Sequence, residues 1–272
     1  MESGMNYSVN DMVEYIYDRT NYSRGVAIVL GSGLGDFADN LNNKTVIKYA
    51  DIPGYPRPTV EGHAGEFVFG DLNGISVLGA KGRFHFYEGH DFHTVTLPVQ
   101  LFHKLGVDTL IITNAAGSTR RHLPPGTLIA LSGHLDGTFR HNADDPKVVA
   151  GPPFHDKKLL SLAQAAAEKT AVELATGVYC WTLGPAYETP DEIKYFSDLG
   201  ADAVGMSTVP ELQAAARFDL PALGISCLTN YAAGITDQPL THQEVMETAE
   251  AVKDKFTRLI VAVIGNIGSR LV

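Results

Sequence analysis

The alternation of short apolar runs with longer stretches of helical period constrains the fold of this chain most strongly. Aliphatic, mostly β-branched runs typical of buried strands occur at 26–30, 109–113, 127–131, 178–183, 203–206 and 222–228. Apolar residues with helical spacing lie between or after them, at 157–174, 191–199 and 243–264. Alternation of this kind predicts an α/β fold with a mainly parallel central sheet flanked by helices.

One further pair of runs predicts antiparallel pairing. Residues 66–70 and 75–80 are joined by Asp-Leu-Asn-Gly, and an Asn-Gly dipeptide between two strands favours a tight hairpin turn. The sheet is therefore predicted to be mixed. The chain has 272 residues, of which 44% are hydrophobic, and it shows no repeat or linker. We expect residues 1–272 to form a single domain with a substantial core.

The charge balance and the cysteines limit the classes of partner and compartment. The formal net charge of −10 argues against nucleic acid and anionic membranes, because both require a basic footprint. Cys180 and Cys227 lie in apolar runs without a CxxC pair, which indicates buried free thiols in a reducing compartment. No signal-peptide pattern and no run of about 18 apolar residues is present. We expect a soluble, cytoplasmic protein that binds neither nucleic acid nor membrane.

A glycine-rich loop follows the first predicted strand. Gly31, Gly33 and Gly35 permit a sharp turn, and a helix start is expected after it. Backbone N–H groups and a helix N-terminus together favour an anion beside Ser32. The P-loop Gly-Lys-Ser/Thr is absent, and Asp36 stands where the dinucleotide fingerprint requires glycine, which argues against a dinucleotide-dependent oxidoreductase. The alternative interpretation is a plain strand-to-helix turn.

Three Thr-x-x-Glu patterns predict helix starts with capping boxes, at 189–192, 208–211 and 241–244. In open α/β sheets, ligands bind beyond the carboxyl ends of strands. The segments just before these caps are therefore the first site candidates: Tyr187 and Glu188, Met206 and Ser207, and residues 230–240. The least regular region, 133–153, predicts a long loop of the kind that serves as a lid or an interface.

A polar and aromatic segment at 81–88 carries candidate phosphate ligands. Alternation places Arg83, His85 and Tyr87 on one face of an extended chain, and the arginine fork and the histidine ring suit phosphate oxygens. Ser207, beside a predicted helix start, would complete a cradle with Ser32. The alternatives are a solvated strand face for this segment and simple capping for Ser207.

Three further positions at strand ends are candidates for ligand contacts. The small residues at 114–117 let backbone amides approach a ligand, with a tight strand-to-helix turn as the alternative. Glu188 offers a carboxylate to the N–H groups of a heterocycle, and Tyr187 offers a stacking face. The alternative interpretation is that Glu188 only stabilises a helix N-terminus. Asn230 can donate to and accept from a base edge, or belong to a turn. No HExxH, GxSxG or Cys/His ligand spacing is present, and we expect no metal.

Seven motifs in sequence order resemble those of the trimeric, low-molecular-mass purine nucleoside phosphorylases. They extend from near residue 26 to the last predicted helix and are Gly-Ser-Gly-Leu-Gly at 31–35, Gly-His-Ala-Gly at 62–65, Gly-Arg-Phe-His-Phe-Tyr-Glu-Gly at 82–89, Thr-Asn-Ala-Ala-Gly at 113–117, Gly-Pro-Ala-Tyr-Glu-Thr at 184–189, Gly-Ala-Asp-Ala-Val-Gly-Met-Ser-Thr-Val-Pro-Glu at 200–211 and Thr-Asn at 229–230. The resemblance implies a nucleoside phosphorylase-like α/β fold and a homotrimer.

The resemblance also implies a role for each matched residue. Phosphate would be held by Ser32, His63, Arg83, His85, Ser207 and the backbone amide of Ala115. Ribose would be contacted by Tyr87, Met206 and His242, and the base by Tyr187, Glu188 and Asn230. Among these, Asn230, Glu188 and His85 would carry the catalysis. In the family, Glu and Asn at these positions accompany 6-oxopurines.

The implied activity is a pentosyl transfer in purine salvage. Inorganic phosphate, the co-substrate, displaces the base at C1′ of a nucleoside such as inosine or guanosine, or of the deoxy form, and gives (deoxy)ribose 1-phosphate. The attacking anion stabilises oxocarbenium character on the sugar. Asn230 would stabilise the departing purine at N7 and O6, and Glu188 would bind N1–H. Neither a cofactor nor a covalent enzyme intermediate is required.

This sequence departs from the family pattern in one region. Gly-His-Leu-Asp at 133–136 replaces the usual Asp-His-Ile-Asn, and the segment after it, which in the family delivers a phenylalanine to the neighbouring subunit, is short. Phe139 and Phe154 are the candidates for that contact. Alternatives of the same fold are a xanthosine-preferring or a methylthioadenosine phosphorylase, the latter disfavoured by Glu188 and Asn230. A nucleoside-binding protein without turnover is the alternative from another class.

Overall fold

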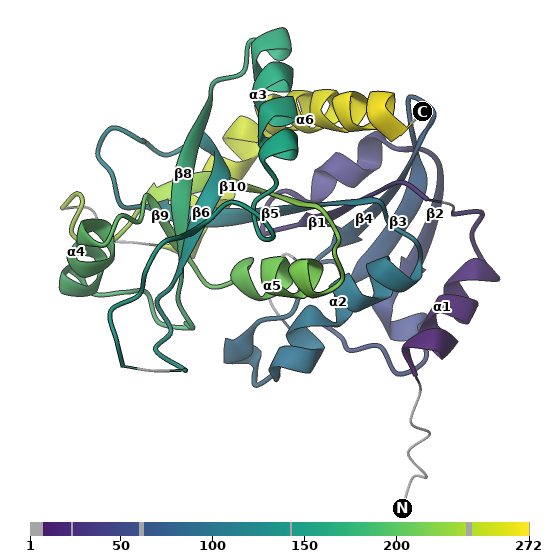
Figure 1. Cartoon of the computed structure of the whole chain (residues 1–272), viewed down its shortest axis with the longest axis horizontal. Helices are drawn as coiled ribbons and strands as arrows, with labels where there is room; N and C mark the ends of the chain where they lie inside the picture. The colour runs from purple at the N-terminus through teal and green to yellow at the C-terminus, as the bar shows by residue number, and fades with distance from the viewer. Residues whose placement is uncertain (1–7, 23, 60–62, 142, 238–240, 272) are drawn as a thin grey trace, which may run out of the picture.

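The computed structural model describes residues 8–22, 24–59, 63–141, 143–237 and 241–271 and contains one mixed, ten-stranded sheet (Figure 1). Its strands are β1 Val26–Leu30, β2 Asn42–Lys48, β3 Glu66–Leu72, β4 Ile75–Lys81, β5 Thr109–Ser118, β6 Leu128–Asp136, β7 Val149–Ala150, β8 Leu174–Trp181, β9 Ala203–Gly205 and β10 Ala222–Tyr231. Their order is β10-β6-β8-β9-β5-β1-β4-β3-β2, and β7 pairs with β6. An additional pairing of β10 with β5 closes part of the sheet into a ring.

Helices cover both faces of this sheet. They are α1 Val9–Tyr17, α2 Phe92–Lys104, α3 Lys157–Thr170, α4 Pro190–Asp198, α5 Val209–Arg217 and α6 His242–Leu271, with short 3₁₀ helices η1 Gly35–Asn40, η2 Tyr49–Asp51 and η3 Phe86–Glu88. One core lies between the sheet and α3 with α6, and another between the sheet and α1, α2 and α5 (Figure 1). Strand β1 shows why both faces are apolar: Ile28 packs into the first core and Val29 into the second.

The predicted alternation and the predicted mixed sheet are confirmed. The hairpin is confirmed too, because β3 and β4 pair antiparallel around Asn73 and Gly74, whose positive φ angles of 54° and 82° suit an Asn-Gly turn. Helix α3 is shorter than the predicted 157–174. It ends at Thr170, where Ala171 takes a left-handed conformation, and the next strand begins at Leu174, earlier than predicted.

The prediction of a long loop over 133–153 is wrong at its start. Residues 133–136 continue β6, and Gly133 and His134 pair with β7. A Cβ atom on Gly133 would lie 3.1 Å from Val148 Cγ1 and 3.2 Å from the carbonyl oxygen of Val149. The glycine that departs from the family pattern therefore permits the close approach of β7.

The glycine-rich loop leads into a short 3₁₀ helix, η1, instead of an α-helix. A dipole argument for an anion at this point is correspondingly weak, because the macrodipole needs a longer run of aligned peptides. The glycines still have a structural purpose. Gly33 has a φ of 74°, and a Cβ atom there would lie 2.4 Å from that of Ala249 in α6.

Both cysteines are buried free thiols, as predicted. In the part of the chain that the structure describes, no helix combines the length and the apolar character needed to cross a membrane.

Candidate active site

A cavity of about 410 Å³ opens beyond the carboxyl ends of β1, β5 and β10, where an α/β sheet is expected to bind ligands. Strand β9, helix α6 and the segments after β4 and β8 complete it. All but one of the residues that the sequence singled out for the site line this cavity. They are Ser32, His63, Arg83, His85, Tyr87, Ala115, Tyr187, Glu188, Met206, Ser207 and Asn230. His242 is the first residue of α6, and its side chain lies outside the described part of the structure, as do Gly62 and residues 238–240.

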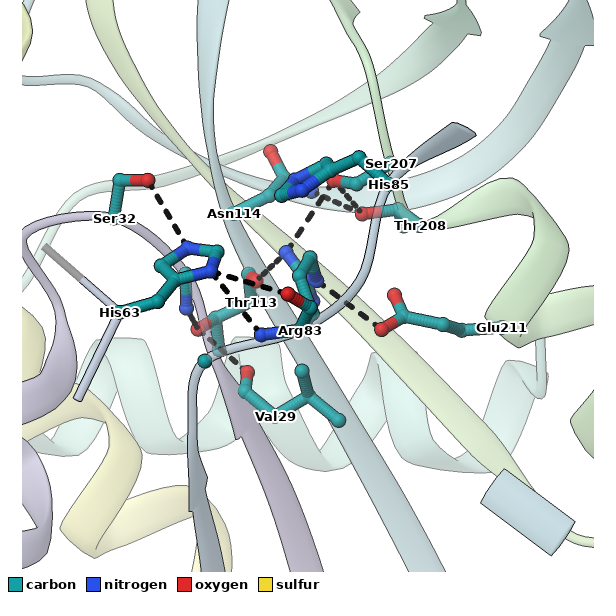
Figure 2. A network of polar contacts seen from close by, with 12 residues as sticks. Val29, Ser32, His63, Arg83, His85, Thr113, Asn114, Ser207, Thr208 and Glu211 are labelled. Atoms are coloured by element: carbon teal, nitrogen blue, oxygen red, sulfur yellow. Dashed lines mark hydrogen bonds and ion pairs between the residues drawn. The ribbon is translucent and has the colours of Figure 1, made fainter. Parts of the chain in front are cut away.

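Arg83 is buried at the base of the cavity and is held by acceptors from two other elements (Figure 2). Its Nε donates to Oε1 of Glu211 on α5 at 3.1 Å, and its Nη1 donates to the carbonyl oxygen of Thr113 on β5 at 2.7 Å. Nη1 also lies 3.3 Å from Ser207 Oγ. Within the described residues, the buried Nη2 has no hydrogen-bond partner. A buried, unpaired N–H donor in a fixed guanidinium is suited to an anion.

The rings of His63, His85 and Tyr87 stack in a row beside Ser32. His63 Nε2 lies 3.3 Å from Ser32 Oγ, and its Nδ1 contacts the backbone of Arg83 (Figure 2). His63 stacks on His85 at 5.5 Å between ring centroids, and His85 stacks on Tyr87 at 4.7 Å. The predicted shared face of Arg83, His85 and Tyr87 on an extended strand is wrong, because β4 ends at Lys81 and Tyr87 lies in η3.

Glu88 orients the ring of His85. Its Oε1 accepts from His85 N and from His85 Nδ1, at 2.8 and 3.0 Å. Burial raises the pKa of Glu88, but the hydrogen bonds from His85 and Thr59 outweigh burial and lower the pKa to about 2. Nδ1 of His85 is therefore the protonated nitrogen, and Nε2 is left for a ligand.

Burial keeps both histidines neutral near pH 7. It lowers the pKa of His63 to about 4, with the neighbouring His85 and Arg83 acting in the same direction. Burial and Arg83 also lower the pKa of His85, against the opposing effect of Glu88. The cavity thus offers neutral histidine donors and acceptors beside one arginine.

The predicted capping box at 208–211 is wrong. Thr208 has φ 74° and makes no side-chain capping bond; its Oγ1 instead accepts from Asn114 Nδ2 at 2.8 Å and lies 3.2 Å from Ser207 Oγ. Glu211 faces Arg83 instead of the helix start. The box at 189–192 is confirmed, and at 241–244 Glu244 N donates to Thr241 Oγ1 at 3.2 Å. The strand-to-helix turn considered for 114–117 is also excluded, because these residues continue β5.

Glu188 and Asn230 line the same cavity, together with Val204 and Tyr187. Glu188 Oε1 accepts from Thr182 Oγ1 at 2.5 Å. Burial raises the pKa of Glu188, and the hydrogen bond from Thr182 opposes that rise. Tyr187 is 44% exposed and stands at the rim.

The side chain of Asn230 has a defined orientation. Oδ1 accepts from Thr229 Oγ1 at 3.0 Å, and Nδ2 donates to the carbonyl oxygen of Tyr231 at 3.0 Å. Because an amide group carries two N–H bonds, Nδ2 retains one for a ligand. A register shift between Leu228 and Asn230 places this side chain at the cavity.

Several residues of this network were not singled out by the sequence. Thr113, Thr182 and Glu211 are all buried and hydrogen-bonded to site residues. Glu211 was placed in a capping box because its spacing from Thr208 fits one. No local signal marks its actual partner, which lies 128 residues away in the sequence.

A family model described as the Phosphorylase superfamily matches residues 25–265. Purine nucleoside phosphorylase 1 of Geobacillus stearothermophilus is 43% identical over 267 residues, covering 96% of this chain and 97% of the relative. That of Bacillus subtilis is 45% identical over 246 residues, covering 88% and 91%. A crystal structure of Schistosoma mansoni purine nucleoside phosphorylase in complex with inosine superimposes with a TM-score of 0.85 at 31% identity, over 94% of this chain and 95% of that one.

The fold, the cavity and the family match define a phosphorylase. With relatives of this similarity over most of its length, the chain belongs to the purine nucleoside phosphorylases, a family of pentosyltransferases.

Proposed function

We propose that the chain, acting as a single nucleoside phosphorylase domain, catalyses the reversible phosphorolysis of 6-oxopurine ribonucleosides and deoxyribonucleosides such as inosine and guanosine. The products are the free base and (deoxy)ribose 1-phosphate, and inorganic phosphate is the co-substrate. The proposal rests on one cavity that contains both kinds of ligand group. Arg83 has a buried N–H donor without a partner among the described residues, and the carboxylate of Glu188 and the amide of Asn230 suit the edge of a purine.

Phosphate binds at the Arg83 end of the cavity in this proposal. Nη2 of Arg83 donates to one oxygen, while Ser32, Ser207, His63 and the backbone amide of Ala115 surround the others. Glu88 fixes a neutral His85 with Nε2 unprotonated, so this nitrogen accepts a hydrogen bond from a protonated phosphate oxygen. Charge-assisted bonds from a preorganised site hold the nucleophile without a metal or cofactor.

The nucleoside lies between this phosphate and the carboxylate of Glu188. Tyr87, Met206 and His242 contact the sugar, and Tyr187 covers the base. Glu188 accepts from N1–H of a 6-oxopurine. The free N–H of Asn230 Nδ2 donates to N7 as electron density moves onto the ring.

The reaction is a single displacement at C1′. A phosphate oxygen forms a bond to C1′ while the bond from C1′ to the purine nitrogen breaks, and the electron pair of that bond leaves with the purine. Positive character on the sugar ring is stabilised by the phosphate, and negative character on the purine by Asn230. Positioning of two substrates in one cavity supplies a large part of the acceleration.

The compartment, the metabolic role and the oligomeric state are proposed from the resemblance to the trimeric purine nucleoside phosphorylases. We place the enzyme in cytoplasmic purine salvage and expect a homotrimer in which Phe139 or Phe154 contacts a neighbouring sugar site. Phe139 is 46% exposed, and Phe154 packs edge-on against His134 at 5.3 Å between centroids. The greater exposure favours Phe139.

Base recognition is tested by comparing inosine with adenosine in wild-type enzyme and in the variants Glu188→Gln and Asn230→Ala. We expect wild type to prefer inosine, and each variant to lose about 100-fold or more in kcat/KM for inosine, as when a buried polar partner or a transition-state donor is removed. A preference for xanthosine over inosine would instead indicate a xanthosine-preferring phosphorylase of the same fold. Inosine turnover unchanged in both variants would refute the base assignment.

A further inference from the structure

Thr182 lies directly behind Glu188 and does not itself line the cavity described above. It follows the end of β8 and is 7% exposed. Its backbone N–H donates to the carbonyl oxygen of Gly205 on β9 at 2.9 Å, so the junction of two strands fixes its position. Thr182 is thus anchored by the sheet, whereas Glu188 lies in the segment between β8 and α4.

The hydroxyl of Thr182 donates to Glu188. Oγ1 lies 2.5 Å from Oε1 of Glu188 and 3.4 Å from the carbonyl oxygen of Gly205. A hydroxyl has one hydrogen, and the shorter contact to a carboxylate is the stronger bond. Among the described residues, Thr182 is the only side chain that hydrogen-bonds Glu188.

We propose that Thr182 is a positioning residue that determines the preference for 6-oxopurines, by holding Oε1 of Glu188 as a hydrogen-bonded carboxylate and leaving Oε2 to accept from the base. This inference rests on the proposed function, in which Glu188 binds N1–H. It names a residue that touches no substrate and acts through Glu188.

The surroundings of Glu188 make such a donor necessary. Its partial burial disfavours the charged form, and Glu192 on α4 acts in the same direction. Cys180 on β8 and the neighbouring Tyr187 are the other titratable groups that interact with it, and neither provides a positive charge. In the described part of the chain, no Lys, Arg or His forms an ion pair with Glu188. The donors that favour its ionised form are the Thr182 hydroxyl and the backbone N–H of Glu188.

The protonation state of Glu188 decides which base it accepts. An ionised carboxylate accepts from the N1–H of hypoxanthine or guanine but offers no donor to the unprotonated N1 of adenine. A protonated Glu188 reverses this match. Loss of the Thr182 donor is therefore expected to weaken 6-oxopurine recognition most at low pH.

The variant Thr182→Val tests this inference, because valine has nearly the shape of threonine and lacks the hydroxyl. Thr182→Ser retains the donor, and Thr176→Val makes the same change at an exposed position of β8. The readouts are the pH profile of kcat/KM for inosine at saturating phosphate and the ratio of the dissociation constants of hypoxanthine and adenine at pH 7.

We expect Thr182→Val to shift the acid limb of the pH profile of kcat/KM for inosine to higher pH by about one unit. This is the size expected for loss of a hydrogen bond to a charged group. The preference for hypoxanthine over adenine falls about tenfold. Thr182→Ser and Thr176→Val keep the wild-type profile and ratio. If Thr182→Val does not fold, Thr182→Ala replaces it in the same comparison.

An unshifted profile in the valine or alanine variant would overturn the inference, and so would an equal effect of Thr182→Ser, which indicates packing. Glu188→Gln, measured alongside, separates the two proposals. If it abolishes inosine turnover while Thr182→Val changes nothing, only the role of Thr182 fails. If Glu188→Gln is also without effect, the proposed function fails at the base site.

Discussion

At the scale of single residues, the ion pair of Arg83 with Glu211 governs the electrostatics of the site. Both side chains are 2% exposed, and one oxygen of Glu211 and one nitrogen of Arg83 have no partner within the described residues. Burial of two charges is costly unless each remains compensated. A phosphate beside Nη2 would complete the partners of Arg83, while Glu211 balances its charge when phosphate is absent.

Replacement of Glu211 by glutamine tests this balance. Removal of one charge from a buried pair costs about 3–5 kcal/mol, so the variant is expected to unfold at a clearly lower temperature in phosphate-free buffer. Phosphate then compensates Arg83 and should raise Tm more in the variant than in wild type. Thermal unfolding with and without phosphate measures the effect. Glu66→Gln, which breaks the ion pair with Lys81 on β4, is the control. Equal phosphate-induced shifts of Tm in wild type and Glu211→Gln would show that phosphate does not compensate the charge of Arg83.

The sequence predicted most of the residues that line the cavity but not the residues that hold them. Arg83, Glu188 and Asn230 stand next to strand ends or in recognisable motifs, where local patterns point to ligand contact. The support for Arg83 comes from Glu211 across 128 positions, and that for Glu188 from Thr182 at the end of the preceding strand. Such contacts depend on how the strands pair, which local spacing does not reveal.

At the scale of elements, the junction of β6 with the segment before α3 depends on two buried histidines. His155 Nδ1 donates to the carbonyl oxygen of Leu131 at 3.0 Å, so its Nε2 is left to accept from His134 Nδ1 at 2.9 Å. Protonation of His155 places a hydrogen on Nε2 and removes that acceptor. Burial lowers the pKa of both rings to about 4, with His155 also lowering that of His134.

This junction predicts a loss of stability in acid. The unfolded chain has ordinary histidine pKa values near 6.5 and binds protons first, so the free energy of unfolding falls as pH decreases from 6.5 to 4. At about 1.4 kcal/mol per pKa unit, each ring contributes up to about 3 kcal/mol. Urea unfolding at several pH values measures the slope. His155→Gln should flatten it, whereas the exposed His122→Gln should not. A slope identical in wild type and His155→Gln would rule out this role.

Strands of the sheet interior were predicted well because they are buried on both faces and read as continuous apolar runs. Elements at the edges were missed. Strand β2 is largely exposed, α1 is short, and α2 contains Pro98 in its interior, which argues locally against a helix. Strand β2 forms because it pairs with β3, and α1 and α2 form because they cover the sheet, which is information carried by tertiary packing.

At the scale of the whole molecule, the ring of β5, β10, β6, β8 and β9 brings the ends of distant segments to one cavity. The proposed phosphate end draws on the segment after β4, on Ser32 after β1, on the backbone of β5 and on Ser207 before α5. The proposed base end draws on β10 and the segment after β8. None of the described residues in 133–153 lines this cavity, and the region borders a second cavity of about 530 Å³ whose lining includes Phe139 and Phe154. A cavity lined by these two phenylalanines fits the proposed contact between subunits.

The proposed trimer predicts a solution mass of about three times the 29.3 kDa of the chain. If Phe139 reaches a neighbouring sugar site, Phe139→Ala should lower kcat/KM for inosine about tenfold without changing that mass, and Phe154→Ala should have a smaller effect. Light scattering and steady-state kinetics test the two points. A monomer with full activity would contradict both.

Phosphorolysis by this enzyme is tested by the rate of hypoxanthine release from inosine as a function of phosphate concentration, with ribose 1-phosphate measured in the same samples. We expect saturable dependence on phosphate, negligible release without it, and one ribose 1-phosphate formed for each hypoxanthine. Release that is independent of phosphate, with free ribose as the product, would show a hydrolase instead and contradict the assignment of the Arg83 end of the cavity to phosphate.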